Sequence, residues 1–193
     1  MPTAVRKSDP PPLPVTVADF DSFVDAQADG YAFELVGGEI VMMTNPTETH
    51  EQIAGNIGAP LKLAMDRRNC RTYQGGMRIQ RSSESKGTDK PKPDVVVRCG
   101  PAGKGTYITD PLIVIEVLSP TTMDSDRGRK LDLYKTLPTL RHIALVYQDQ
   151  MRVEHYSRTD AGWQLDVLTT AAAELTFDAV EFGIDLAQIY FGA

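Results

Sequence analysis

Two acidic residues stand within strongly apolar stretches of the chain. Glu116 interrupts the apolar run 112–118, and Asp94 follows Pro93 at the start of a second apolar run, 94–97. A carboxylate in such a run is costly unless a cation or hydrogen-bond donors meet it. Two of them on neighbouring strands can bind Mg²⁺, which often keeps one or two carboxylate ligands beside water and substrate phosphate. The alternative for Glu116 is a strand-end glutamate that points to solvent or to an arginine.

Lys130 is the third candidate. It falls on the same face of a predicted helix as Leu133, Tyr134 and Leu137, so we expect it to point inward with the apolar side. A lysine held there could orient an attacking water or stabilise a charged transition state. The alternative is a lysine that lies along the surface and keeps its amine in solvent.

Weaker candidates complete the predicted site. Glu34 lies in an apolar hairpin strand, but Glu39 is an equally available neighbour, and we expect one of the two to be exposed. His50 lies in the first turns of a long helix, where free amides and the helix dipole attract phosphate, so it is a candidate substrate contact. Arg78 and Arg127 are the basic residues that we also expect to contact the substrate.

The charge distribution points to a polyanionic partner. The 193-residue chain has a net charge of −6, but residues 62–104 hold eleven basic residues against four acidic ones, which makes that segment +7. Such a split predicts a basic face beside an acidic body, as expected of a protein that holds nucleic-acid phosphates. The alternative is a solvated, lysine-rich loop.

The elements that must position these residues alternate between helix and strand. We expect a proline-rich disordered arm over residues 1–14 and a single domain over 15–193. A Gly37-Gly38 turn predicts a hairpin, and Asn45-Pro46 predicts the start of a long helix that reaches Arg68. The full prediction comprises helices 16–28, 46–68, 124–137 and one near 186, and strands 31–36, 39–44, 71–74, 77–81, 94–98, 111–118, 141–147, 152–157 and 163–169. This order predicts an α/β fold with a mixed sheet.

Other features of the sequence exclude several classes of protein. No apolar stretch reaches 18 residues and no signal peptide is evident, so we expect no membrane association and a cytoplasmic location. Cys70 and Cys99 lack metal-binding spacing and are expected to be reduced and packed. His142 and His155 are expected to serve packing or the surface. The sequence contains no nucleophile elbow and no glycine-rich phosphate loop.

Four motifs, taken in order, resemble those of a known family. They are Phe-Glu-Leu-Val-Gly-Gly-Glu-Ile-Val at 33–41, Pro-Asp-Val-Val-Val at 93–97, Ile-Glu-Val-Leu-Ser-Pro-Thr-Thr at 115–122 and Arg-Lys-Leu-Asp-Leu-Tyr at 129–134. Over about residues 16–170 the chain resembles the Uma-type (DUF820-like) endonucleases, a branch of the PD-(D/E)XK nuclease superfamily. The resemblance implies a restriction-endonuclease-like mixed central sheet flanked by helices, with Asp94 and Glu116 as the two metal ligands.

The chain departs from the superfamily pattern at one position. The pattern places a lysine two residues after the glutamate, and this chain has Leu118 there. That change either disables the site or requires a lysine from elsewhere, and Lys130 resembles such a migrated lysine. Glu34 resembles the extra acid that some members add to the metal site.

These observations lead to a specific expectation and two alternatives. We expect a DNA endonuclease that depends on Mg²⁺, with Mn²⁺ as a substitute. The sequence leaves the oligomeric state open, although double-strand cleavage by a single-site protein would favour a two-fold homodimer. The alternatives are a catalytically inactive nucleic-acid-binding module on the same fold and a hydrolase of small phosphoesters.

Overall fold

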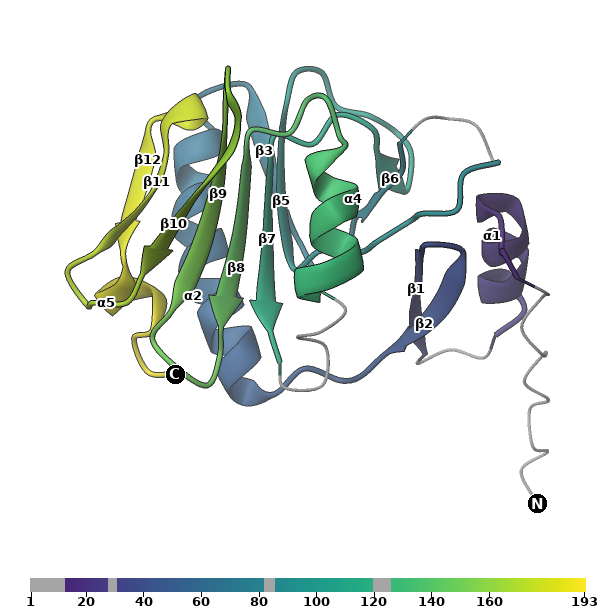
Figure 1. Cartoon of the computed structure of the whole chain (residues 1–193), viewed down its shortest axis with the longest axis horizontal. Coiled ribbons are helices and arrows are strands. Elements are labelled where there is room, and N and C mark those ends of the chain that lie inside the picture. The colour runs from purple at the N-terminus through teal and green to yellow at the C-terminus, as the bar shows by residue number, and fades with distance from the viewer. Residues whose placement is uncertain (1–12, 28–30, 82–85, 120–125) are drawn as a thin grey trace.

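A six-stranded mixed sheet forms the centre of the computed structural model, which describes residues 13–27, 31–81, 86–119 and 126–193 (Figure 1). The strand order is β10-β9-β8-β7-β5-β3. The strands are β3 (Cys70–Gln74), β5 (Val95–Cys99), β7 (Ile113–Leu118), β8 (His142–Tyr147), β9 (Val153–Thr159) and β10 (Gly162–Leu168). Only β7 and β8 pair in parallel, and the other neighbours in this sheet are antiparallel. The predicted α/β class with a mixed sheet is confirmed.

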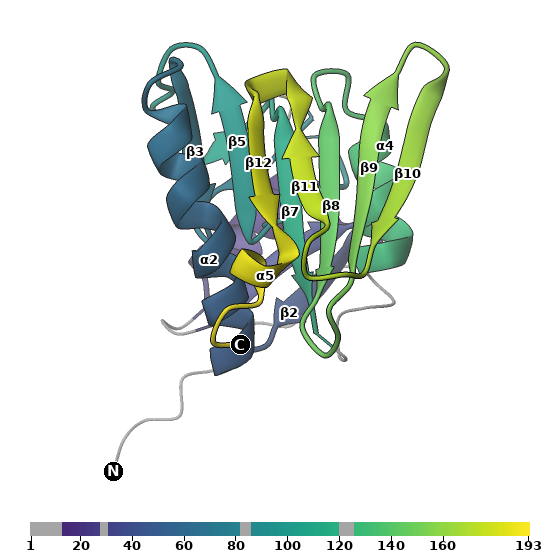
Figure 2. The same ribbon diagram turned by 90° about the vertical axis from the view of Figure 1, so that its left-hand side faces the viewer.

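Helix α2 (Glu48–Met65) covers one face of this sheet. Its apolar residues recur every four positions, and Ile53, Ile57, Leu61 and Met65 are all fully buried. The same layer is completed by the hairpin β11 (Glu174–Phe177) and β12 (Phe182–Asp185), followed by α5 (Leu186–Ile189) (Figure 2).

The opposite face is covered by a π-helical turn (Asp126–Lys130) that continues into α4 (Leu131–Lys135). Side chains of β7 alternate between the two faces. Ile113, Ile115 and Val117 pack in the cluster beneath α2, whereas Val114 and Leu118 pack in the cluster that includes Tyr134 of α4. Glu116 therefore points toward α4.

A separate hairpin, β1 (Ala32–Val36) and β2 (Glu39–Met43), stands apart from the central sheet (Figure 1). Gly37 and Gly38 have φ values of 60° and 77°, as a tight two-residue turn requires. Helix α1 (Val17–Asp25) packs on it, and the chain also forms a small parallel pair, β4 (Arg78–Ile79) with β6 (Tyr107–Ile108). An isolated bridge from Leu35 to Lys90 joins the hairpin to the loop that leads to β5.

The predicted start of the long helix is wrong by two residues. Thr47, not Asn45, is the N-cap, because its side-chain oxygen accepts a hydrogen bond from the His50 amide at 3.2 Å. Strands β6, β11 and β12 were not predicted, because they are short and their pairing depends on tertiary packing of residues such as Leu175 and Ile184.

The prediction of two reduced cysteines is also wrong. Cys70 and Cys99 lie directly opposite each other on β3 and β5, and the structure joins them in a disulfide with Cα atoms 3.9 Å apart. Strand register brings the two residues together, and their separation of 29 residues in sequence gives no sign of it.

Two further expectations concern the N-terminal arm and membrane-spanning segments. The predicted arm, 1–14, lies outside them except for its last two positions. Within the described part of the chain, no helix has the length and apolar character needed to cross a membrane.

Candidate functional site

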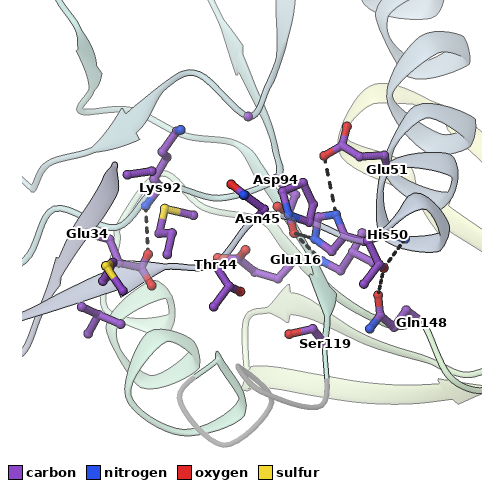
Figure 3. Close-up of a pocket in the computed structure, with 18 of the residues that line it drawn as sticks. Glu34, Thr44, Asn45, His50, Glu51, Lys92, Asp94, Glu116, Ser119 and Gln148 are labelled. Carbon is purple, nitrogen blue, oxygen red and sulfur yellow. Dashed lines mark hydrogen bonds and ion pairs between the residues drawn. The ribbon is translucent and has the colours of Figure 1, made fainter. Parts of the chain in front are cut away.

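A cavity of about 330 Å³ lies at one edge of the central sheet, between the end of β7, the start of α2 and the β1–β2 hairpin (Figure 3). Its polar lining consists of Glu34, Thr44, Asn45, Thr47, His50, Glu51, Lys92, Asp94, Glu116, Ser119, Lys130 and Gln148. The fold thus brings five predicted site residues, Glu34, His50, Asp94, Glu116 and Lys130, to one cavity from distant parts of the chain.

Lys130 lies between two buried carboxylates. Its Nζ is 3.0 Å from Glu116 Oε1 and 3.1 Å from Glu34 Oε2. The three side chains are only 3–6% exposed. The Lys92 amide also donates to Glu34 Oε2, at 3.3 Å. Buried charges are tolerated when they are paired and hydrogen-bonded, and this arrangement meets both conditions.

The helix after β7 explains how Lys130 reaches Glu116. Lys130 ends the π-helical turn, and Tyr134 follows four residues later on the same face. The Tyr134 hydroxyl donates to Glu116 Oε1 at 2.5 Å, so both residues contact the same carboxylate oxygen. The predicted inward position of Lys130 is confirmed, whereas Leu118 is fully buried in the apolar cluster below α4.

Asp94 directly precedes β5, and two groups hold its carboxylate beside β7. The Val117 amide donates to Asp94 Oδ2 at 2.7 Å, and His50 Nε2 lies 3.2 Å from the same oxygen. The Asp94 side chain is 20% exposed, against 3% for Glu116, so Asp94 is the more accessible carboxylate. His50 therefore contacts Asp94 in the structure. Its predicted contact with a substrate phosphate stays a prediction.

The first turn of α2 is tied to the end of β8. Thr47 caps the helix, and its hydroxyl donates to Gln148 Oε1 at 2.9 Å. The sequence did not single out Thr47, Gln148, Ser119 or Lys92 as site residues. Gln148 and Ser119 each follow directly after a strand end at the same sheet edge, a position where functional residues concentrate, and this signal could have found them.

Lys92 adds a second cationic group to the cavity. Burial lowers the pKa of its ammonium, and the nearby Arg78 charge acts in the same direction, while Asp94 and Glu34 oppose the shift. The pKa therefore falls because the side chain is partly removed from water in a region that already holds another cation.

Two carboxylates of the cavity, Asp94 and Glu116, fit the binding of one hard divalent cation. Asp94 and Glu116 supply carboxylate oxygens, which Mg²⁺ prefers, and two such ligands suffice when water and phosphate complete the sphere. Among the described residues, no three His, Cys, Asp or Glu side chains gather closely enough to hold a metal together. Glu34, the third expected ligand, pairs with Lys130.

Arg78 and Arg127 are absent from the cavity lining. Arg78 Nη1 donates to the Phe33 carbonyl at 2.6 Å, and its guanidinium lies over the Phe20 ring. Arg127 Nη2 is 2.9 Å from Glu154 Oε1. Their predicted contacts with substrate stay predictions. Other basic residues of the segment 62–104 also have partners within the protein, namely Lys62, Arg68, Arg71, Lys90 and Arg98.

Glu154 supports the site from the same face of the sheet. It pairs in register with Leu145, which pairs with Glu116, so the two acids lie in one row across β7, β8 and β9. Its burial would raise its pKa, but hydrogen bonds from Arg152 and Tyr147 outweigh that and lower it. Because Arg127 belongs to the π-helical turn, its ion pair with Glu154 anchors the turn that ends at Lys130.

A histidine pair lies on the opposite face of the sheet, away from the cavity. His142 Nδ1 and His155 Nε2 are 3.1 Å apart, and His142 Nε2 lies 2.8 Å from Asp178 Oδ1. Burial lowers the pKa of His155 to about 4, and the neighbouring His142 adds to the shift. Both rings pack against Phe177, which agrees with the packing role expected for them.

Comparison with known proteins identifies relatives of this chain. A model of the Uma2 family, described as "putative restriction endonuclease", matches residues 17–188. Two uncharacterised proteins of Synechocystis sp. (strain ATCC 27184 / PCC 6803 / Kazusa) are similar. The protein slr1290 is 29% identical over 161 residues, which are 82% of this chain and 83% of the relative. The protein sll1609 is 28% identical over 147 residues, 75% and 82% of the two chains.

A solved structure shares the fold. It is the crystal structure of "a putative nuclease belonging to DUF820" from Anabaena variabilis ATCC 29413, with a TM-score of 0.76 and 16% sequence identity. The match covers 92% of this chain and 98% of the other, so the expected nuclease-like architecture with a mixed central sheet is confirmed. Because the family model spans nearly the whole described chain, the chain belongs to the Uma2 family of "putative restriction endonucleases".

Proposed function

We propose that this protein is a DNA nuclease that hydrolyses phosphodiester bonds with Mg²⁺, or Mn²⁺ in its place, held by Asp94 and Glu116. The observation that carries the proposal is the meeting of two carboxylates and a buried lysine in one cavity. When bound, the cation neutralises phosphate charge and lowers the pKa of a water ligand, which supplies the nucleophile at neutral pH.

The residues around the cation site have separate roles in this proposal. Lys130 donates a hydrogen bond to the attacking water or to a phosphate oxygen, and so stabilises the charge that develops there. Glu34 acts as a positioning residue, because it holds the Lys130 ammonium together with Glu116. Tyr134 fixes the Glu116 carboxylate, and His50 with the Val117 amide fixes Asp94.

Lys130 fills the role that the superfamily pattern gives to the residue at Leu118. A lysine at 118 would project from the same strand face as Glu116, whereas Lys130 reaches Glu116 from the covering helix. The ammonium thus arrives at the same carboxylate from a different element. The replacement at position 118 is therefore compatible with an active site. A homodimer, which double-strand cleavage would favour, stays a prediction.

One observation favours a second candidate. The cavity, at about 330 Å³, has a size that suits a single small ligand, so hydrolysis of small phosphoesters is the alternative activity.

The experiment that tests the proposal is incubation of the purified protein with plasmid, linear duplex, single-stranded DNA and a small phosphodiester, each in Mg²⁺, Mn²⁺ and EDTA. The proposal expects cleavage of DNA in either metal and none in EDTA. Hydrolysis of the small ester with intact DNA would support the alternative. Metal-dependent binding of DNA without any cleavage would instead identify an inactive nucleic-acid-binding module.

A further inference from the structure

The cavity contains an apolar wall that the chemistry of phosphodiester hydrolysis does not use. The β1–β2 hairpin contributes Glu34 and the apolar residues Ala32, Val41, Met42 and Met43 to the lining. In the hairpin register Glu34 pairs with Val41, and Ala32 pairs with Met43. Directly paired residues project from the same face. The face that delivers Glu34 to Lys130 therefore also presents three apolar side chains to the cavity.

Polar groups that can recognise hydrogen-bonding edges line the same space. Thr44 and Asn45 directly follow β2, and Gln148 comes from the end of β8 (Figure 3). Amide and hydroxyl side chains can pair with both donors and acceptors. The cavity thus combines an apolar wall, acidic residues that fit a cation, and a set of neutral polar groups.

We propose that this wall is a subsite for one unstacked nucleobase, so that the substrate is single-stranded DNA or DNA with an unpaired base. The inference rests on the proposed nuclease function and deepens it. Each part of a nucleotide matches one part of the cavity. The face of the base fits the apolar wall, the base edge with its donors and acceptors fits the neutral polar groups, and the phosphate fits the cation site. The base face packs on Val41 and Met43, and a thioether such as that of Met43 makes favourable contacts with aromatic rings.

The depth of the site argues against a continuous duplex as substrate. The carboxylates of Glu116 and Glu34 are 3% and 6% exposed, so a reacting phosphate must enter the cavity rather than rest on the surface. In an intact duplex both faces of each base are covered by its stacked neighbours, so no base face is available to the wall. An unpaired nucleotide can bring its base in with its phosphate, at an unstacking cost that is smallest where pairing is already absent.

The hairpin is suited to bind a base because it is not part of the central sheet. Its two strands pair with each other and with no strand of the central sheet, and it is held by contacts such as the bridge from Leu35 to Lys90 and the ion pair of Glu34 with Lys130. The wall therefore forms one side of the cavity, while Asp94 and Glu116 come from the central sheet. A ligand that contacts both must bridge the two units.

Equilibrium binding tests the subsite without requiring turnover. A short single strand with one 2-aminopurine is titrated with protein in Ca²⁺, and the fluorescence of the base analogue is followed. Met43→Ala should weaken binding about fivefold, in line with about 1 kcal/mol for the loss of one base contact. Met151→Ala removes an exposed methionine outside the cavity lining and should leave the affinity unchanged. Equal affinities for wild type and Met43→Ala would overturn the subsite.

Cleavage of matched substrates separates this inference from the nuclease proposal. The same sequence is presented as a single strand, as a duplex with one unpaired base, and as a full duplex. The subsite predicts faster cutting of the first two, with cuts beside the unpaired base, and a raised KM in Met43→Ala. Equal cutting of all three would refute the subsite and leave the nuclease intact. Base-dependent binding with no cutting of any substrate would refute the nuclease and leave the subsite.

Discussion

The histidine pair on the α2 face of the sheet makes protein stability depend on pH in a defined window. Burial lowers the pKa of His155 from 6.5 to about 4, so the unfolded chain binds a proton more tightly than the folded one. Between these two values the unfolded state takes up more protons, and stability falls as the pH falls. Each tenfold change in proton affinity is worth about 1.4 kcal/mol, so the full loss from His155 is about 3 kcal/mol.

The variant His155→Gln isolates this contribution. Glutamine has no titration in this range, and its amide can still donate to His142 Nδ1, which accepts when His142 Nε2 donates to Asp178. Carboxylates that titrate at low pH remain in both proteins and cancel in the comparison. Urea unfolding is measured for both proteins at pH 7.5 and at pH 4.5.

The wild type should lose about 2.5 kcal/mol more than His155→Gln between these two pH values, since most of the window is crossed. His142, whose pKa is also lowered by burial, is present in both proteins and strengthens the common loss. A parallel loss of stability in the two proteins, equal within about 0.5 kcal/mol, would refute the assignment of this pH dependence to the buried ring.

Three further predictions concern the residues around the site. Lys130→Met should remove activity and lower the free energy of unfolding by about 3 kcal/mol, because Glu34 and Glu116 are left as buried acids without their ammonium. Adding Glu34→Gln to this variant removes one of the two unpaired acids and should restore part of the lost stability in denaturant unfolding but not activity, and restored cleavage would contradict a catalytic role for the lysine. Thr47→Ala should cost about 1 kcal/mol in the same assay through loss of the helix cap. Glu154→Gln should cost about 2 kcal/mol, because the carboxylate that pairs with Arg127 and Arg152 is lost, and an unchanged midpoint would show that these ion pairs do not stabilise the fold.

The placement of single site residues was predictable from local patterns. Glu116 was found because an acid interrupts a buried strand, and the alternation along β7 directs it toward α4. Lys130 was found because helical periodicity places it on the face of Tyr134. Both signals need only a few neighbouring residues.

The partners of these residues were not predictable, because they depend on how distant elements cross. The contact between Lys130 and Glu34 joins the covering helix to a hairpin that is separate from the sheet. Arg127 was expected to meet substrate, but strand register places buried Glu154 within its reach. The Cys70–Cys99 bridge likewise follows from register, which a single sequence does not reveal.

The most direct test of the proposed site is single-turnover cleavage of single-stranded DNA in Mg²⁺ by the wild type, Glu116→Gln and Asp110→Asn. Asp110 pairs with Arg98, lies outside the cavity lining and serves as a matched acid-to-amide control. We predict metal-dependent cleavage by the wild type, no detectable cleavage by Glu116→Gln and an unchanged rate for Asp110→Asn. Cleavage by Glu116→Gln at the wild-type rate would contradict the central claim that Glu116 holds the catalytic metal.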